Sequence, residues 1–282
     1  PIPVIEKNND VLIKVEVVSI CGTDVHILEV PPDYIATPNT ILGHEIAGQV
    51  LEIGKDVSTL KVGDRVVINP NEYDCTCQYC KLNLPNHCEN LKALGIHVNG
   101  GFAKYCKVSE KVCYKISPTV SPNVAAFAEP LACVINGAEK VKVQPAETVL
   151  ILGSGPIGLL FLKLFKSCGA KVIISELSEF RRKIAEDNGA DIVVDPKKKN
   201  LEKIIEEETN IGTDVVVDAT GSLMETGLRV ARKGGRFLVF GVNTNAVVKI
   251  PQFEITFKEL RVLGTWLANA TFPKAVKIIE SV

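Results

Sequence analysis

A glycine-rich turn between an apolar strand and a helix most strongly constrains the fold of this chain. Residues 148–152 form an apolar run of strand length, and the sequence Gly153-Ser-Gly155-Pro156-Ile157-Gly158 follows it directly and opens a helical pattern. Glycines permit a tight turn and a close approach of pyrophosphate, while the helix N-terminus offers unpaired amides and a favourable dipole. The motif predicts a dinucleotide site, and the competing interpretation is a glycine-rich turn without a ligand.

An acidic residue follows the next predicted strand. Residues 171–175 are apolar enough for a second strand, and Glu176 comes directly after them. A carboxylate at this position can accept hydrogen bonds from both hydroxyls of an adenosine ribose and repels a 2′-phosphate. Glu176 therefore predicts NAD rather than NADP, although Arg181 and Arg182 nearby could soften the discrimination. An incidental surface glutamate is the alternative.

Strands and helices alternate through the second half of the chain. The predicted strand–helix pairs are 148–152 with 157–167, 171–175 with 180–188, and 214–218 with 224–231, followed by a strand at 237–241. Such alternation is typical of a doubly wound parallel α/β sheet. Before residue 122, short Val/Ile-rich runs at 11–18, 46–53 and 64–69 predict a mostly β module. We expect domains at 1–122 and 123–268, with 269–282 beginning a return to the first.

Composition argues against several functions. Lys and Arg total 32 against 33 for Asp and Glu, which gives no electrostatic attraction for nucleic acid or an anionic membrane. The apolar runs are too short to cross a bilayer, and no secretory signal is recognisable. We expect a soluble, cytoplasmic protein. Because the sequence begins at Pro1 and stops within a helical pattern, we expect both natural ends to be missing.

The nine cysteines are unevenly distributed. Four of them crowd into residues 75–88, which suits metal binding in a reducing cytoplasm better than disulfides. Four others lie in apolar runs and are expected to be buried thiols, namely Cys106, Cys113, Cys133 and Cys168.

Two segments of the β module carry metal-ligating side chains. The first is Ile20-Cys21-Gly22-Thr23-Asp24-Val25-His26-Ile27, and the second is Gly43-His44-Glu45. Together they offer a thiol, an imidazole and a carboxylate, a set that zinc accepts, and a catalytic zinc keeps one position open for water or substrate. Metal-activated chemistry on an alcohol or carbonyl is the first hypothesis.

These motifs together resemble the zinc-containing medium-chain alcohol and polyol dehydrogenases. The resemblance rests on Cys21-Gly-Thr23-Asp24-x-His26 and on Gly43-His44-Glu45-x-x-Gly48-x5-Gly54-x-x-Val57, with the later motifs in the family's order. The Glu129-Pro130 pair places the chain nearest the sorbitol and threonine dehydrogenase branch. The resemblance implies a GroES-like catalytic domain and a Rossmann domain.

The resemblance also implies roles for the first cluster. Cys21, His44 and Glu45 would bind a catalytic zinc, and Glu129 would either bind it directly or hold its water. Thr23 and His26 would relay a proton from the substrate, and Asp24 could orient His44. The alternative for His26 and Asp24 is an ordinary turn or capping role.

A structural zinc is implied by the second cysteine cluster. Cys77, Cys80 and Cys88 match the family's spacing, but the position of the remaining ligand falls on Asp74, and Cys75 stands one residue later. The spacing of the family's ligands favours Asp74, whereas the preference of structural zinc for soft thiolate ligands favours Cys75, so both residues remain candidates. A metal-free lobe is a third possibility.

Three further segments end apolar strands at the side where open α/β sheets bind ligands. They contribute the expected cofactor contacts Thr220, Gly241, Val242, Thr265 and Trp266. The resemblance places the nicotinamide near the last two segments, whereas ordinary glycine turns are the plainer interpretation.

The leading hypothesis is a zinc- and NAD-dependent dehydrogenase that oxidises a secondary alcohol of a polyol, sugar or hydroxy-amino acid such as L-threonine. The alternatives are a simple alcohol dehydrogenase and a non-catalytic cofactor-binding relative. The resemblance implies a homodimer or homotetramer formed by sheet edges near residues 234–264, and neither a nucleic-acid nor a membrane partner.

Overall fold

The computed structural model describes residues 2–281, which divide into two compact units. Unit 1 comprises the chain up to Ile135 together with the segment from Leu267 onward, and unit 2 comprises Asn136–Trp266. The sequence-based boundary at residues 122/123 differs from this division, because the first half of helix α4 (Ala128–Val141) belongs to unit 1. There the Thr271 hydroxyl donates to the Ala132 carbonyl at 2.6 Å, which ties the helix to the C-terminal segment.

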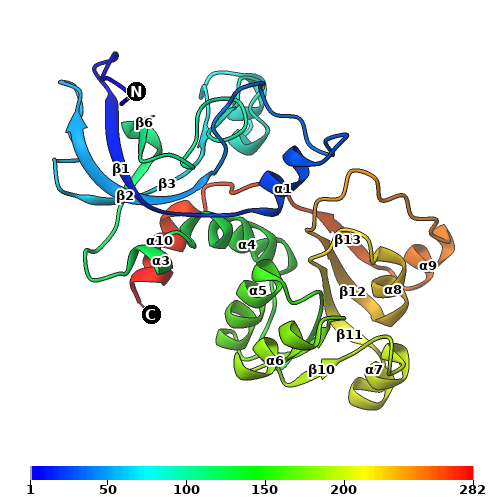
Figure 1. The fold of residues 1–282 in the computed structure, drawn as a ribbon. Coiled ribbons are helices and arrows are strands. Elements are labelled where there is room, and N and C mark those ends of the chain that lie inside the picture. The colour runs from blue at the N-terminus through cyan, green and yellow to red at the C-terminus, as the bar shows by residue number, and fades with distance from the viewer. Residues whose placement is uncertain (1, 282) are drawn as a thin grey trace. The chain divides into compact units, whose positions relative to one another are not determined.

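Unit 1 is built on a five-stranded antiparallel sheet in the order β6-β1-β2-β3-β7 (Figure 1). The strands are β1 (Asp10–Ser19), β2 (Glu45–Ile53), β3 (Arg65–Ile68), β6 (Tyr105–Ser109) and β7 (Cys113–Lys115). The inward-facing positions of these Val/Ile-rich runs form the core, with Val11, Ile13, Ile46, Val50 and Val66 all buried. The expected mostly β module is therefore present.

Short elements of unit 1 carry most of its polar motifs. They are α1 (Gly22–Leu28), α2 (Gln78–Lys81), α3 (Pro122–Ala125), α10 (Phe272–Glu280), the 3-10 turns η1 (Pro85–His87) and η2 (Glu110–Val112), and the two-stranded pair β4 (Asn71–Glu72) and β5 (Lys92–Ala93). Cys21 and the four cysteines of residues 75–88 thus lie in loops and short helices beside the sheet rather than within it.

Unit 2 is a six-stranded parallel sheet in the order β10-β9-β8-β11-β12-β13, as the alternation predicted (Figure 1). Its strands are β8 (Thr148–Leu152), β9 (Lys171–Ser175), β10 (Ile192–Val194), β11 (Thr213–Asp218), β12 (Ala231–Val239) and β13 (Arg261–Gly264). Its further helices are α5 (Pro156–Ser167), α6 (Glu179–Asp187), α7 (Leu201–Thr209), α8 (Met224–Val230) and α9 (Gln252–Phe257).

The strand order of unit 2 reverses beside β8. The chain moves from β8 to β9 and β10 on one side, and to β11, β12 and β13 on the other. Open α/β sheets bind ligands at the carboxyl ends of the strands next to such a reversal. The glycine-rich turn follows β8, so the topology puts it at this position.

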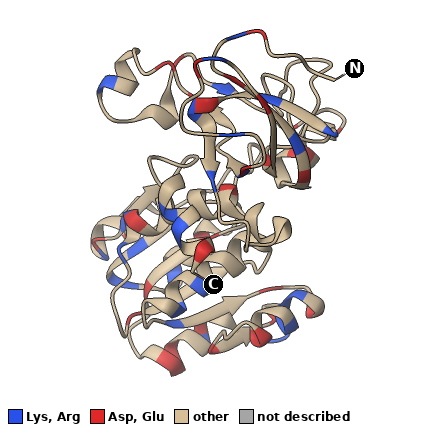
Figure 2. Cartoon of the chain, turned by 90° about the vertical axis from the view of Figure 1, so that its left-hand side faces the viewer, with Lys and Arg blue, Asp and Glu red and all other residues tan. Residues whose placement is uncertain are grey.

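Charged residues of both signs are interspersed among the elements, and neither sign dominates (Figure 2). Among residues 2–281, no helix combines the length and the apolar character that crossing a membrane would require.

Candidate metal and cofactor sites

The first metal-ligating cluster comes together in unit 1. One ligand atom each from Cys21, His44 and Glu45 lies within 4.8 Å of the other two. Cys21 precedes helix α1 as its N-cap, and Glu45 opens strand β2 directly after His44, so two loop-to-element junctions meet here. Both His44 and Glu45 are buried. A thiol, an imidazole and a carboxylate in this arrangement suit zinc.

Asp24 links the two segments that supply these ligands. Its carboxylate accepts hydrogen bonds from the backbone N–H of Cys21 at 2.9 Å and of Gly43 at 3.1 Å. Its Oδ1 also lies 3.6 Å from Nδ1 of His44. Asp24 is only 1% exposed, so it acts as a fixed anchor under both segments. The expectation that Asp24 orients His44 agrees with this geometry.

The electrostatics of the cluster favour a bound cation. Burial alone would lower the pKa of His44, but the neighbouring Asp24 and Cys21 side chains and the charge of Glu129 together raise that pKa to about 11. His44 Nδ1 is buried and makes no hydrogen bond within residues 2–281. The residues present therefore fit a zinc ion, whose charge these anionic groups would stabilise.

Glu129 lies near this cluster but outside the close group of three. It projects from the first turn of α4 and is buried. Burial raises the pKa of Glu129 to about 7, with His44 opposing the shift and Glu45 adding to it. The thiol of Cys133, one turn later, donates to Glu129 at 3.5 Å. Two roles were left open for Glu129, direct binding of the zinc and holding of its water. Because Glu129 lies outside the close group of ligands, this geometry agrees better with the second role.

The two residues of the expected proton relay occupy helix α1. The Thr23 hydroxyl lies 3.8 Å from the Cys21 sulfur, beside the metal-ligating group. His26 sits in the last turn of the helix, and its Nδ1 is 3.4 Å from a carboxylate oxygen of Glu29. One residue that sequence reasoning missed is Ser19, whose hydroxyl donates to the Glu45 carboxylate. Its position at the end of β1 was the only signal.

The second metal-ligating cluster contains an aspartate. Asp74, Cys77, Cys80 and Cys88 form a group with ligand atoms within 4.8 Å of one another. Cys75 is not in it, because this residue adopts a left-handed φ of 61° and its exposed thiol lies near the carbonyl of Tyr73. Of Asp74 and Cys75, the two candidates for the fourth ligand of this cluster, only Asp74 lies close to the three cysteines.

Asp74 is held firmly in this position. Its carboxylate accepts hydrogen bonds from the backbone N–H of Thr76 at 2.8 Å and of Cys77 at 3.0 Å, and from the side chain of Asn90 at 2.6 Å. These bonds, the one from Asn90 first, hold the pKa of Asp74 well below its usual range. The carboxylate is therefore ionised and oriented before any metal binds.

One expectation about the remaining cysteines is wrong. Cys106 is buried, and Cys113 and Cys133 are partly buried, but Cys168 is exposed. Cys168 caps the C-terminal end of α5, and this end of the helix faces solvent even though the run before it is apolar.

The glycine-rich turn of unit 2 has the backbone that the motif requires. Gly153 has φ +94°, and a Cβ there would lie 2.8 Å from Thr220. A Cβ at Gly158 would lie 2.1 Å from the Gly153 carbonyl oxygen, whereas Gly155 faces open space. Gly155 caps α5, and Pro156 and Ile157 begin it. The helix N-terminus is thus open to a phosphate group.

Glu176 is fixed at the end of β9. One carboxylate oxygen accepts from the backbone N–H of Ser154 at 2.9 Å, and the other accepts from that of Ser178 at 2.8 Å. Burial opposes ionisation, but these hydrogen bonds outweigh it and hold the pKa of Glu176 below its ordinary value. Glu176 therefore carries a negative charge directly against the glycine-rich turn.

The two neighbouring arginines differ. Arg182 donates to the Glu176 and Leu177 carbonyls and pairs with Asp195 at 3.2 Å. The side chain of Arg181 is exposed on α6. The guanidinium of Arg182 is therefore already bound by groups of the protein itself. Arg181 is the arginine that could reach a cofactor phosphate.

The later strand ends form a packed set of loops. Asp218 accepts hydrogen bonds from the Thr220 backbone and hydroxyl at 2.9 and 2.7 Å. A Cβ at Gly241 would lie 2.3 Å from the Gly221 nitrogen, so these two loops touch backbone to backbone. Sequence reasoning gave Asp218 no cofactor role, although an acid ending an apolar strand was the available signal.

Three more expected cofactor contacts lie on the same side of unit 2. Val242 is 44% exposed, and the buried Thr265 hydroxyl has no hydrogen-bond partner within residues 2–281. The Trp266 carbonyl accepts from the Asn136 side chain at 3.3 Å. An unpartnered hydroxyl and exposed glycine loops fit a polar ligand such as a nicotinamide carboxamide.

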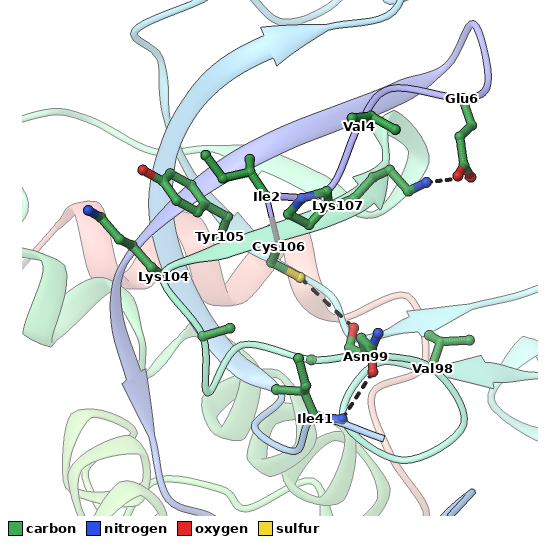
Figure 3. Close-up of a pocket in the computed structure, with 13 residues that line it drawn as sticks. Ile2, Val4, Glu6, Ile41, Val98, Asn99, Lys104, Tyr105, Cys106 and Lys107 are labelled. Atoms are coloured by element: carbon green, nitrogen blue, oxygen red, sulfur yellow. Dashed lines mark hydrogen bonds and ion pairs between the residues drawn. The ribbon is translucent and has the colours of Figure 1, made fainter. Parts of the chain in front are cut away.

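A cavity of about 640 Å³ lies elsewhere in unit 1. Figure 3 shows Ile2, Val4, Lys104, Tyr105 and Lys107 around it, along the outer strand β6. None of the Cys, His or carboxylate residues of the two metal-ligating clusters lines it.

Comparison with known proteins identifies both halves of the chain. A model described as an alcohol dehydrogenase GroES-like domain matches residues 7–118, and one described as a zinc-binding dehydrogenase matches residues 156–281. The D-arabinitol dehydrogenase 1 of Uromyces fabae is 35% identical over 99% of this chain and 81% of its own length.

Two further relatives are similar to the chain. The L-threonine 3-dehydrogenase of Thermococcus kodakarensis is 38% identical over 90% of this chain and 74% of its own length. A structure from Sinorhizobium meliloti 1021 with NADP bound superposes with a TM-score of 0.95, at 36% identity over 99% of this chain and 83% of that one.

Proposed function

Because the chain belongs to the zinc-binding alcohol dehydrogenase family, an oxidoreductase family that acts on CH–OH donors, we propose that it oxidises a secondary alcohol of a polyol with NAD. The observation that carries the proposal is the group of Cys21, His44 and Glu45 within 4.8 Å, together with the ionised Glu176 beside the glycine-rich turn.

Zinc binding is assigned to the three residues of that group. Zinc bound there would acidify an alcohol hydroxyl, and the nicotinamide would accept the hydride. Asp24 holds both ligand segments through two backbone N–H groups and orients His44. Glu129, whose pKa is raised to about 7, can hold or release a proton near neutrality beside the ligands.

The proton exit is assigned to helix α1. Thr23 lies beside the Cys21 sulfur, where its hydroxyl can accept a proton from the substrate oxygen. His26, on the same helix and partly exposed, can deliver that proton to solvent. The second zinc is assigned to Asp74, Cys77, Cys80 and Cys88, a closed set without a position for substrate.

Cofactor choice is assigned to Glu176. The negative charge of Glu176 would repel a 2′-phosphate. Because Arg182 already binds backbone carbonyls and Asp195, it is not available to offset that repulsion. The exposed Arg181 is the cation that could admit NADP, the cofactor bound in the Sinorhizobium meliloti structure. NAD is the better match to this balance of charges.

The substrate class is assigned by similarity. The names of three relatives state that they are dehydrogenases of D-arabinitol, D-altritol and L-threonine, which are hydroxyl-rich or hydroxy-amino compounds.

We also propose a cytoplasmic homodimer or homotetramer. The free thiols of all nine cysteines and the position of β13 as the edge strand of the unit 2 sheet support this.

A panel of polyols, sugars and L-threonine, assayed with NAD and with NADP, tests the proposal. We expect reduction of NAD by at least one polyol and a rate with NADP lower by about 10-fold or more. Glu176→Ala should narrow this preference, because the charge that repels the 2′-phosphate is gone, whereas Glu179→Ala on the exposed face of α6 should leave it unchanged. A preference for NADP in the unmodified enzyme would overturn the cofactor assignment.

A further inference from the structure

A third group of metal-ligating side chains lies at the end of helix α1. One ligand atom each from His26, Glu29 and Asp33 lies within 4.8 Å of the other two. His26 Nδ1 is 3.4 Å from Glu29 Oε2 and 4.0 Å from Asp33 Oδ2. The three side chains are 38%, 41% and 34% exposed, so an ion in solution can reach them.

The backbone brings the third residue of this group back to the helix. The N–H of Asp33 donates to the His26 carbonyl at 3.0 Å, and the N–H of Tyr34 donates to the same carbonyl at 3.4 Å. Asp33 is therefore held beside His26 by main-chain bonds and not only by the attraction between their side chains. Little rearrangement would be needed to close the group around an ion.

The spacing suits a small divalent cation. Nitrogen and oxygen ligands at roughly 2.0 to 2.2 Å from zinc in a tetrahedron stand about 3.4 Å apart. The separation between His26 Nδ1 and Glu29 Oε2 has this value, and Asp33 Oδ2 is slightly farther away. One imidazole and two carboxylates, with water in the open position, form a ligand set that zinc accepts.

We propose that His26, Glu29 and Asp33 form a divalent-cation site of the zinc type, distinct from the two clusters that contain cysteine. Its occupancy has a consequence that rests on the proposed function. An ion on Nδ1 takes the lone pair with which the His26 imidazole would accept a proton, so excess zinc slows alcohol oxidation. An imidazolium paired with two carboxylates explains the same contacts but leaves no lone pair on that nitrogen.

Counting bound zinc distinguishes these explanations. The holoenzyme, with both cysteine-containing sites filled, is dialysed against micromolar Zn²⁺ and its metal content is measured. We expect one additional equivalent in the unmodified enzyme, its loss in the Glu29→Gln/Asp33→Asn double variant and in His26→Gln, and its retention in Glu52→Gln, an exposed carboxylate on β2. No additional equivalent, or one that the double variant retains, would overturn the site.

Enzyme rate tests the consequence separately. With saturating zinc, we expect the rate of NAD reduction to fall by about 10²-fold in the unmodified enzyme and to change little in the double variant, because proton transfer contributes factors of this order. Full activity with the additional zinc bound would refute the effect on the His26 relay while the metal count still supports the site. Failure of the site and failure of the proposed function are therefore distinguishable.

Discussion

Asp24 is a single buried carboxylate that holds together the two segments carrying the proposed zinc ligands. Its two backbone hydrogen bonds fix the segments that carry Cys21 and His44. Burial alone would raise the pKa of Asp24, but His44 and these N–H groups hold it below its ordinary value. The charge therefore persists in the interior, and it favours a cationic partner at His44.

The aspartate in the second cluster gives a prediction at the residue scale. Asp74→Asn keeps an oxygen that can accept from Thr76 and Cys77 but removes the charge that a zinc ligand contributes. We expect it to weaken retention of the second zinc by about 10-fold or more during dialysis against a chelator. Cys75→Ser should retain this zinc, since the Cys75 thiol is exposed and outside the group.

Metal content after dialysis is the measurement for both variants. Loss of the second zinc in Cys75→Ser with retention in Asp74→Asn would mean that the loop shifts when metal binds and that the thiolate is the ligand.

The gathering of Cys21, His44 and Glu45 could be expected from their residue types and from the family motifs that contain them, although the helix that begins after Cys21 was not predicted. Sequence spacing could not choose between Asp74 and Cys75. That choice depends on the left-handed φ of Cys75 and on the hydrogen bond that the side chain of Asn90 donates to Asp74, 16 positions earlier in the sequence. Exposure of Cys168 was missed for a similar reason, since an apolar run does not reveal where its helix ends.

At the scale of elements, Asp191 ties together the start of β9 and the end of α5. Its carboxylate accepts from Lys166 at 2.7 and 2.8 Å and from the backbone N–H of Val172 at 2.6 Å. Burial would raise the pKa of Asp191, but the bonds from Lys166 and Val172 outweigh it and hold the pKa below its ordinary value.

Asp191→Asn should therefore destabilise the protein in a pH-dependent way. A carboxyl group with a lowered pKa in the folded state stabilises above its unfolded pKa, and this stability is lost as pH falls through the folded pKa. About a third of the side chain is exposed, so screening limits the expected loss to about 1 kcal/mol near neutral pH.

Urea unfolding at neutral pH and below pH ~4 measures this effect, and the difference between variant and parent should shrink at the lower pH. Asp187→Asn, which removes only an exposed pair with Lys183, is the control and should have a smaller effect. A difference that stays constant with pH would contradict an ionised Asp191.

The alternation of strands and helices in unit 2 could be predicted, because fully buried parallel strands read as continuous apolar runs. Element bounds were less predictable. Strand β12 begins at Ala231, six positions before the expected strand at 237–241, since its first residues carry charges and glycines. The first half of α4 belongs to unit 1 and is bonded there to the C-terminal segment through Thr271 and Ala132, 139 residues apart, a contact that no local pattern reveals.

At the scale of the whole molecule, the chemistry is divided between the two units. Unit 1 supplies all residues of the metal-ligating clusters, and unit 2 supplies the glycine-rich turn, Glu176 and the later strand ends. Each unit has its own hydrophobic core. Because each of these sets of residues forms a recognisable motif within one unit, the reaction class could be predicted from the sequence. No motif specifies which alcohol is bound, so the particular substrate could not be predicted.

The central claim is that the group around Cys21 holds the zinc on which alcohol oxidation depends. The most direct measurement is the rate of NAD reduction by the preferred polyol, together with zinc content, in the unmodified enzyme and in Cys21→Ala, with Cys168→Ala as an exposed-thiol control. We expect Cys21→Ala to lose one zinc equivalent and about 10³-fold or more in rate, and Cys168→Ala to lose neither. An unchanged rate in Cys21→Ala would contradict the claim.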